Sequence, residues 1–285
     1  MATDPEFPHE LLSLQEQPVV RDFWHHVGRT VGYKIPPSIK DIFLQYHAHC
    51  FSDPRPQFTS SRPESPEWQW QKLHSESIFG NCQEAVAATL YHRDNLLQFE
   101  RELLAFPQLD DLKAALGHAG IGGGNTRKLD FEYHAFVFAY RRALDYLAQG
   151  VAALLKQHFR SFRRLPDLLQ NHNVHGWTGE LIKMHSGVAP RLRAFLGTET
   201  NRSTRDRIAH YEHVAAGVVN VNTSGLFLAG GGENLELGGK LATVIGNYIM
   251  DLQHVLDATF KVLVIALPKV SRTSSRTDGG FVSNG

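Results

Sequence analysis

Cysteine is almost absent from this chain of 285 residues, which contains only Cys50 and Cys82. Two cysteines cannot build a disulfide framework, and they cannot supply a cysteine-based zinc site. A reducing compartment is the simplest interpretation, so we expect a cytoplasmic protein. The first residues also lack a basic stretch followed by an apolar run, and no secretory signal is therefore expected.

Net charge is missing as well, because 29 Lys and Arg residues balance 29 Asp and Glu residues. This balance excludes a surface that binds polyanions over its whole extent, whereas a local basic patch is compatible with it. Long apolar runs are also lacking, since the most apolar late segment, 241–267, contains Asp251, His254, Asp257 and Lys261. A membrane span needs about 20 mostly apolar residues. We expect a buried helix here and no membrane as a partner.

Several catalytic motifs are absent too. The chain has neither the Gly-x-Ser-x-Gly turn of serine hydrolases nor the His-Glu-x-x-His helix of zincins. The glycine-rich stretch 117–124 has no preceding strand pattern and no Gly-Lys-Ser/Thr, which a phosphate-binding P-loop requires. We interpret this stretch as a flexible connector.

The overall composition is that of a globular protein, with 42% hydrophobic and 20% charged residues. Residues 1–7 resemble a tag derived from an expression vector. Residues 8–128 are predicted to be an N-terminal helical region that includes a Pro-rich connector at 51–67. Residues 129–268 are predicted to form a helical bundle, and 269–285 a flexible tail.

The fold class is predicted to be mainly all-α. Further helices are expected over 178–195, with a break near Gly187–Pro190, and over 239–267. Residues 218–237 alternate short apolar runs with glycine-rich turns, which predicts a small β-hairpin or meander inserted between helices. The strongest helical pattern is an apolar stripe over nearly 30 residues, formed by Tyr133, Val137, Tyr140, Leu144, Leu147, Val151, Leu154 and Phe159.

The segment Arg205-Asp206-Arg207-Ile208-Ala209-His210 is the strongest functional candidate. Ser203 or Thr204 is a natural N-cap for a helix that begins here, and Ser203 with Asp206 has the spacing of a capping box. The unpaired amides of such a helix start favour a phosphate group. A cation and an imidazole therefore lie near a position that suits an anion.

The spacing within this segment indicates a chemistry. Asp206 and His210 are four residues apart on a helix, so a hydrogen bond between them would fix the imidazole tautomer and favour its protonated form. Arg205 lies about 140° around the helix from His210, but its long side chain reaches across the helix end. Such a site suits metal-independent cleavage of RNA, in which the 2′-hydroxyl attacks phosphorus. His210 would be the general acid or base, and Arg205 would stabilise the phosphoryl charge.

One histidine in each chain supplies one obvious proton-transfer group, and a homodimer that brings two copies together would supply the second. RNA is the expected partner, without a metal or another cofactor. The substrate-binding candidates are Arg202, Arg207, Tyr211 and His213. Arg191 and Arg193 extend this basic set, which is compatible with an RNA groove or with an ordinary solvated face.

This segment resembles the Arg-x4-6-His motif of HEPN domains, in which a polar residue commonly follows the arginine, as Asp206 does. The preceding helix, with Arg141-Arg142-Ala143-Leu144-Asp145-Tyr146-Leu147, resembles the first core helix of that family. The resemblance covers about residues 130–267. It implies a helical bundle, dimerisation through the motif face and ribonuclease activity in a toxin or antiviral defence setting, with an antitoxin or sensor protein as a possible partner. On this basis Arg205 and His210 take the catalytic positions, and Asp206 takes the polar position between them.

This chain departs from one toxin subgroup of the family, because Glu212 stands where that subgroup has a tyrosine. Two other functions stay open. Many HEPN proteins are non-catalytic interaction or ligand-binding modules. The pairs His172-x-x-His175 and His210-x-x-His213 have spacings compatible with a metal or haem site, although ordinary surface histidines are the simpler interpretation.

Overall fold

The computed structural model describes residues 18–51, 65–172, 176–198, 201–210, 217–230 and 233–267, apart from the side chains of Trp24, His210, Glu233 and Asn234. The predicted tag at 1–7, the predicted tail at 269–285 and most of the Pro-rich connector lie outside the described residues. The chain forms two compact units, 1–37 and 38–285. The described elements are mainly helical, which confirms the predicted class.

Within its described residues, the first unit contains helix α2 (Pro18–Thr30). Val19 and Phe23 lie four residues apart, on one side of this helix, and they are 70% and 57% exposed. Arg21 and Arg29 occupy other positions around the helix. The helix is therefore amphipathic, with an exposed apolar side.

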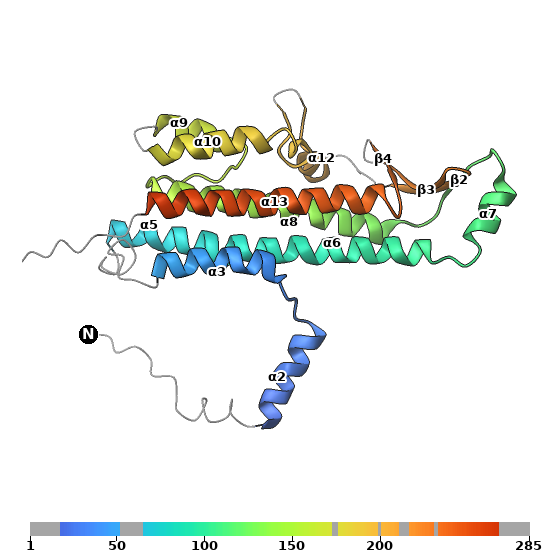
Figure 1. The fold of residues 1–285 in the computed structure, drawn as a ribbon, viewed down its shortest axis with the longest axis horizontal. Helices are drawn as coiled ribbons and strands as arrows, with labels where there is room; N and C mark the ends of the chain where they lie inside the picture. Colours follow the sequence, from blue (N-terminus) through green and yellow to red (C-terminus); the bar gives the residue numbers. More distant parts are fainter. Residues whose placement is uncertain are drawn as a thin grey trace, which may run out of the picture. The chain divides into compact units, whose positions relative to one another are not determined.

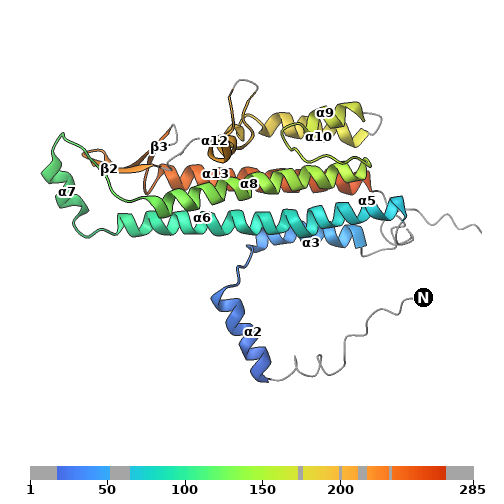
Figure 2. The same ribbon diagram turned by 180° about the vertical axis from the view of Figure 1, so that it is seen from behind.

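Three long helices lie side by side in the second unit (Figures 1 and 2): α6 (Gln83–Leu104), α8 (Arg127–Leu154) and α13 (Lys240–Ala266). The predicted helix over 239–267 corresponds closely to α13. The predicted apolar stripe corresponds to α8, which ends before Phe159. The side chains that α8 buries against its neighbours include Phe136, Val137, Tyr140, Ala143, Leu144, Leu147, Ala148 and Val151.

Two shorter helices extend this core: α3 (Pro37–Phe51) and α5 (Pro66–Ser75). The ring of Tyr46 in α3 stacks on Phe260 of α13, with 4.6 Å between ring centroids. The Tyr46 hydroxyl lies 3.0 Å from Nε2 of His74, and Nδ1 of His74 lies 2.8 Å from the carbonyl oxygen of Gly150. A carbonyl only accepts, so Nδ1 carries the proton and Nε2 accepts from the tyrosine. His74 therefore joins α3, α5 and α8 as a neutral imidazole.

A π-helical segment, η1 (Glu76–Cys82), connects α5 to α6 and packs against α8. A Cβ atom at Gly150 would overlap the side chain of Ile78, so the glycine allows this close approach. Cys82 is fully buried and its thiol faces the carbonyl oxygen of Ala143 at 3.4 Å. Burial raises the pKa of this thiol far above its usual value, which makes it unreactive.

The chain reverses direction where α8 ends. Lys156 adopts a left-handed conformation with φ of 56°, and its amide donates to the carbonyl of Ala153. The amide of Gln157 donates to the carbonyl of Ala152, which completes a Schellman motif. Further on, the amide of Phe162 donates to Asp145 at 2.9 Å. The segment after α8 therefore runs back along that helix.

Four short helices follow: α9 (Leu165–Asn171), α10 (Gly176–Val188), α11 (Arg193–Leu196) and α12 (Thr204–His210). The interval between α10 and α11 confirms the predicted break near Gly187–Pro190. Gly197 ends α11 with φ of 69°, and a Cβ atom there would clash with the backbone of Asn201 and Ser203. The glycine lets the chain fold tightly into the start of α12.

The strands form an antiparallel sheet in the order β1 (Ile121–Gly123), β2 (Val218–Asn222), β3 (Gly225–Gly230) and β4 (Glu233–Glu236). Strands β2 to β4 confirm the predicted meander. The interpretation of 117–124 as a flexible connector is wrong in its last part, because Ile121 pairs with Val221 and Gly123 with Val219. This pairing joins residues about one hundred positions apart, so no local pattern indicates it.

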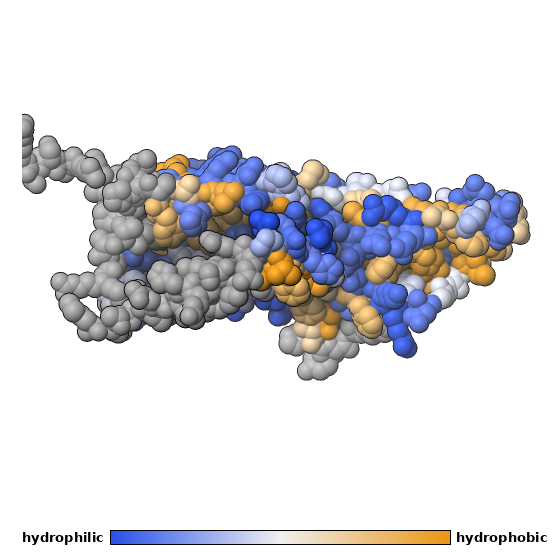
Figure 3. All heavy atoms as spheres, turned by 90° about the horizontal axis from the view of Figure 1, so that it is seen from below, coloured by the Kyte–Doolittle hydropathy of each residue, from blue (hydrophilic) through white to orange (hydrophobic). Residues whose placement is uncertain are grey.

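Helix α7 (Leu109–Leu116) precedes this sheet, and none of its residues is buried. Figure 3 shows hydrophobic residues exposed among hydrophilic ones at the α7 end of the second unit. The side chains of Phe106 and Ile121 are among the exposed apolar groups. Helices α6 and α8 lie before and after the predicted division at residue 128, and they pack along each other within the second unit. Among the described helices, none combines the length and the apolar character that a membrane span requires.

The buried His74 predicts a pH dependence of stability. Burial lowers the pKa of His74 to about 4 from 6.5, against the hydrogen bond to Gly150, which raises it. Between these two pH values the unfolded chain binds a proton at this imidazole, whereas the folded chain does not. The free energy of unfolding therefore falls as the pH falls from about 6.5 to about 4. The loss of stability over this pH interval is about 3 kcal/mol.

The test compares urea unfolding of the native protein with that of His74→Gln over this pH interval. The variant is expected to be less stable at neutral pH but to lose less stability on acidification, because it lacks the titrating imidazole. Equal pH slopes for the two proteins would contradict this assignment.

Candidate functional site

The start of α12 is fixed by Ser203, whose side chain is fully buried. Its Oγ accepts from the amide of Asp206 at 3.0 Å, and its carbonyl oxygen accepts from the amide of Arg207 at 3.0 Å. These bonds identify Ser203 as the N-cap and confirm the predicted capping spacing. The helix therefore begins at the segment that the sequence singled out.

Arg205 and Asp206 form an ion pair at this helix start. Nη1 of Arg205 donates to Oδ1 of Asp206 at 2.9 Å, and their side chains are 40% and 33% exposed. Burial raises the pKa of Asp206, but hydrogen bonds from Ser203 and Arg205 and the charges of Arg205 and Arg141 outweigh it, so the pKa is lowered. Asp206 is therefore ionised at neutral pH.

The predicted hydrogen bond between Asp206 and His210 stays a prediction. His210 is the last residue of α12, but its side chain lies outside the described part of the structure. The described partner of the Asp206 carboxylate is Arg205, the residue next to it. The carboxylate thus orients the guanidinium group of the candidate site.

Helix α12 packs on the outer side of α8. The guanidinium of Arg205 lies over the ring of Phe138, 5.9 Å from its centroid. Beside it, Arg141 donates through Nε to Asp145 at 2.8 Å and through Nη1 to the carbonyl of Phe195 at 3.0 Å. Arg141 therefore holds α11 against α8 and adds positive charge next to Asp206.

More arginines and aromatic rings continue along α8 from this point. Phe138, Arg142 and Tyr146 follow one another at intervals of four residues, so they share the outer side of the helix. Arg142 lies 5.8 Å from the centroid of the Tyr146 ring, and Arg160, on the returning segment, lies 4.0 Å from it. We name Arg205, Phe138, Arg142, Tyr146 and Arg160 the arginine–aromatic track.

The sequence did not single out Phe138, Tyr146 or Arg160 as functional residues. The four-residue spacing of Phe138, Arg142 and Tyr146 was the available signal, but these residues alternate with the buried positions of the same helix. Arg160 gave no signal, because its approach to Tyr146 depends on the left-handed turn at Lys156. A pattern along one helix cannot predict such a return.

The other predicted site residues are distributed differently. Arg202 is exposed just before α12, and Arg207 is half-buried within it. Tyr211 and His213 lie outside the described residues. Arg193 is exposed on α11, whereas Arg191 pairs with Asp251 of α13 at 3.2 Å. The structure therefore brings Arg205 and Asp206 together and gives Arg191 a separate partner.

The histidine pairs considered for a metal are only partly described. His172 follows α9, while His175 and His213 lie outside the described residues. Across the described ranges, no group of three His, Cys, Asp or Glu side chains is arranged to hold a metal ion. His185 is buried beside the carbonyl of Phe162, 3.0 Å from Nε2, and burial lowers its pKa. That histidine has a packing role.

Comparison of the chain with protein-family models, with curated proteins and with solved structures finds no match.

Removal of the Ser203 cap is expected to loosen the start of α12. Ser203→Ala leaves the Asp206 amide without its described acceptor and should lower the free energy of unfolding by about 1 kcal/mol. Thr243→Ala is the matched control, because that hydroxyl bonds a carbonyl four residues earlier on an exposed helix start. The control should change stability by less than about 0.5 kcal/mol. Urea unfolding measures both, and equal losses would contradict the cap assignment.

Proposed function

We propose that the chain is a HEPN-type helical bundle that acts as a metal-independent endoribonuclease. The observation that carries this proposal is the position of Arg205 at one end of the arginine–aromatic track on α8. Arg205 also begins the Arg-x4-His spacing on α12, with His210 at the end of the same short helix. A cation suited to a reacting phosphate thus adjoins a surface suited to a nucleic acid strand.

The track has the two kinds of group that bind single-stranded RNA. Aromatic rings stack on bases, and this contact is worth about 1–3 kcal/mol for each base. Guanidinium groups bind phosphates through paired hydrogen bonds and stack on rings and bases as well. Because these groups are gathered at one place, a chain with no net charge still offers a local surface for a polyanion.

The reaction that fits these residues is attack of a ribose 2′-hydroxyl on the adjacent phosphorus. His210 takes the proton of that hydroxyl, the new bond from O2′ to phosphorus forms, and the bond from phosphorus to O5′ breaks. The products are a 2′,3′-cyclic phosphate and a 5′-hydroxyl. Arg205 stabilises the charge that develops on the non-bridging oxygens. In a homodimer, His210 of the second copy supplies the proton for the leaving oxygen.

The ion pair between Arg205 and Asp206 is compatible with this role. Both side chains are partly exposed, and such a pair is worth about 0–1 kcal/mol. A phosphate that offers two acceptor oxygens competes with an interaction of this size. Asp206 therefore orients the guanidinium before the substrate binds. We place the activity in a toxin or antiviral defence setting, with an antitoxin or sensor protein as regulator.

Substitution of the motif residues tests the proposal. Arg205→Ala and His210→Ala are each expected to reduce the rate of RNA cleavage in EDTA by about 100-fold or more, because each removes a group that acts in the transition state. Arg164→Ala is the matched control, since this exposed arginine pairs with exposed Asp167 at 3.5 Å. The assay follows a labelled single-stranded RNA at low ionic strength.

Three results decide against metal-independent catalysis by this site. One is unchanged cleavage in both motif variants. Another is RNA binding without any cleavage by the native protein, which would leave a non-catalytic RNA-binding module. Complete loss of activity in EDTA would indicate a metal-dependent enzyme instead. Circular dichroism of each variant establishes that it is folded.

The track predicts a separate effect on binding. Tyr146→Ala removes the ring that Arg142 and Arg160 approach and should weaken RNA affinity by about five- to 100-fold, as expected for the loss of one stacked base. Tyr146→Phe should bind nearly as well as the native protein, since it keeps the ring. Tyr91→Ala, at an exposed ring of α6, is the control. Fluorescence anisotropy measures the affinities, and equal affinities for Tyr146→Ala and Tyr91→Ala would exclude stacking at Tyr146.

A further inference from the structure

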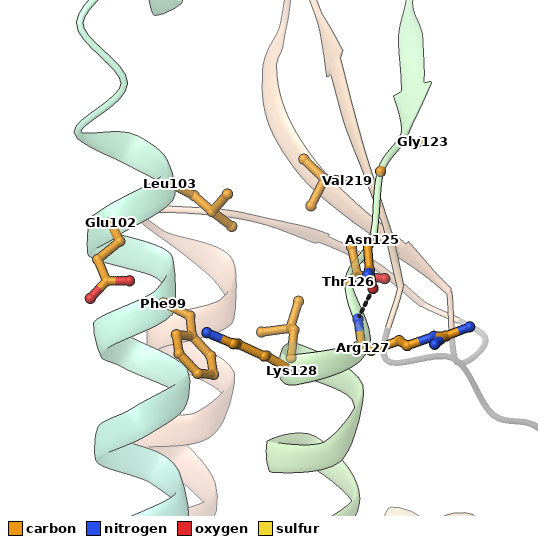
Figure 4. Close-up of a pocket in the computed structure, with 11 residues that line it drawn as sticks. Phe99, Glu102, Leu103, Gly123, Asn125, Thr126, Arg127, Lys128 and Val219 are labelled. Atoms are coloured by element: carbon orange, nitrogen blue, oxygen red, sulfur yellow. Dashed lines mark hydrogen bonds between the residues drawn. The ribbon is translucent and has the colours of Figure 1, made fainter.

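A pocket of about 560 Å³ lies at the opposite end of α8 from Tyr146. Its walls come from the last turns of α6, from the end of β1 and the connection to α8 (123–126), from the first turn of α8 (127–129), and from β2 (Figure 4). This volume is in the range of small-molecule sites, about 300–1,000 Å³. Lys128 and Phe138 are ten residues apart on α8, or about 15 Å along its axis. The pocket is therefore separate from the arginine–aromatic track.

Most of the pocket wall is apolar. Phe99 and Leu103 line it from α6, Leu129 from α8 and Val219 from β2. Leu129 is 5% exposed, whereas the other three lining residues are half-buried. An aliphatic chain or an aromatic ring matches such a surface.

Two hydrogen bonds hold the walls in place. The hydroxyl of Thr126 donates to the carbonyl of Gly217 at 2.9 Å, which ties the start of α8 to the start of β2. The amide of Gly238 donates to the buried carboxylate of Glu100 at 2.6 Å, which ties the end of the sheet to α6. The cavity is therefore formed before any ligand binds, and a ligand does not have to order it.

The charge on the inner side of the pocket is positive. Figure 4 shows the Lys128 side chain extending toward Phe99, whereas Arg127 and the carboxylate of Glu102 point away from the cavity. Glu102 also accepts a hydrogen bond from Gln98 at 2.8 Å. Among the described residues that line the pocket, Lys128 is thus the charged group placed to meet a ligand. A single ammonium beside apolar walls matches a molecule with one anionic group.

We propose that this pocket binds a small amphipathic anion, with an apolar ring or chain against Phe99, Leu103 and Val219 and a carboxylate or similar group at Lys128. The inference does not depend on the proposed ribonuclease activity, because the two sites lie in different places and bind different chemistry. A nucleic acid strand does not match this pocket, since the wall offers one cation and mainly apolar surface.

The probe is 8-anilinonaphthalene-1-sulfonate, which combines an apolar ring system with one sulfonate and fluoresces when it leaves water. The native full-length protein should bind it saturably. Val219→Trp should abolish this saturable binding by filling the cavity. Lys128→Met should weaken the affinity by about two- to fivefold, as expected for one partly exposed charge pair. Lys113→Met, on exposed α7, is the matched control and should bind as the native protein does.

A second measurement separates the apolar part of the ligand from the charged part. Octanoate should displace the probe at lower concentration than 1-octanol does, and octanoate should raise the melting temperature of the native protein more than that of Lys128→Met. Leu103→Trp replaces Val219→Trp if the latter does not fold. Saturable binding that survives the filling substitutions would overturn the pocket assignment. Equal potency of octanoate and 1-octanol, or equal affinities of the two lysine variants, would overturn the assignment of the anion to Lys128.

Discussion

The arrangement of the second unit depends on the burial of one side of α8. Phe136, Tyr140, Leu147 and Val151 lie on that side and are almost fully buried against neighbouring helices. Each such side chain contributes about 1.5–3 kcal/mol through removal of its apolar surface from water. Because the buried side fixes the rotation of α8, it also fixes which residues face outward.

The outward side of α8 brings the residues of the candidate surface together. Phe138, Arg142 and Tyr146 lie there because the core occupies the opposite side of the helix. Two residues from later segments join this surface. Arg160 comes from the segment that returns after α8, and Arg205 comes from α12. For the RNA binding that we propose, the relative magnitudes favour aromatic stacking over ion pairing as the main source of affinity. A stacked base is worth about 1–3 kcal/mol and an exposed ion pair about 0–1 kcal/mol.

Local patterns were sufficient to predict several elements of this fold. The apolar periodicity predicted α8 and α13, because each buries a continuous stripe along its length. The Ser203 cap was predictable because a helix start uses residues within one turn of each other. The meander of β2 to β4 was predictable because short turns connect its strands.

Features that depend on contacts distant in sequence were not predictable. Strand β1 has three residues and pairs with a strand that follows about one hundred residues later. Arg160 reaches Tyr146 only because Lys156 adopts a left-handed conformation, for which glycine is the usual residue. The pocket beside Lys128 likewise combines segments from α6, α8 and β2. Of the candidate site, the sequence predicted Arg205 and Asp206 but not the surface beside them.

The proposed function places RNA along the outer side of α8. Photo-crosslinking of a single-stranded RNA that carries 4-thiouridine, in EDTA with the His210→Ala variant to prevent cleavage, is the decisive measurement. The cross-linked peptides should contain Phe138 or Tyr146, and unlabelled RNA should compete for these cross-links. Cross-links confined to α13 or to α2, with none on α8, would contradict it.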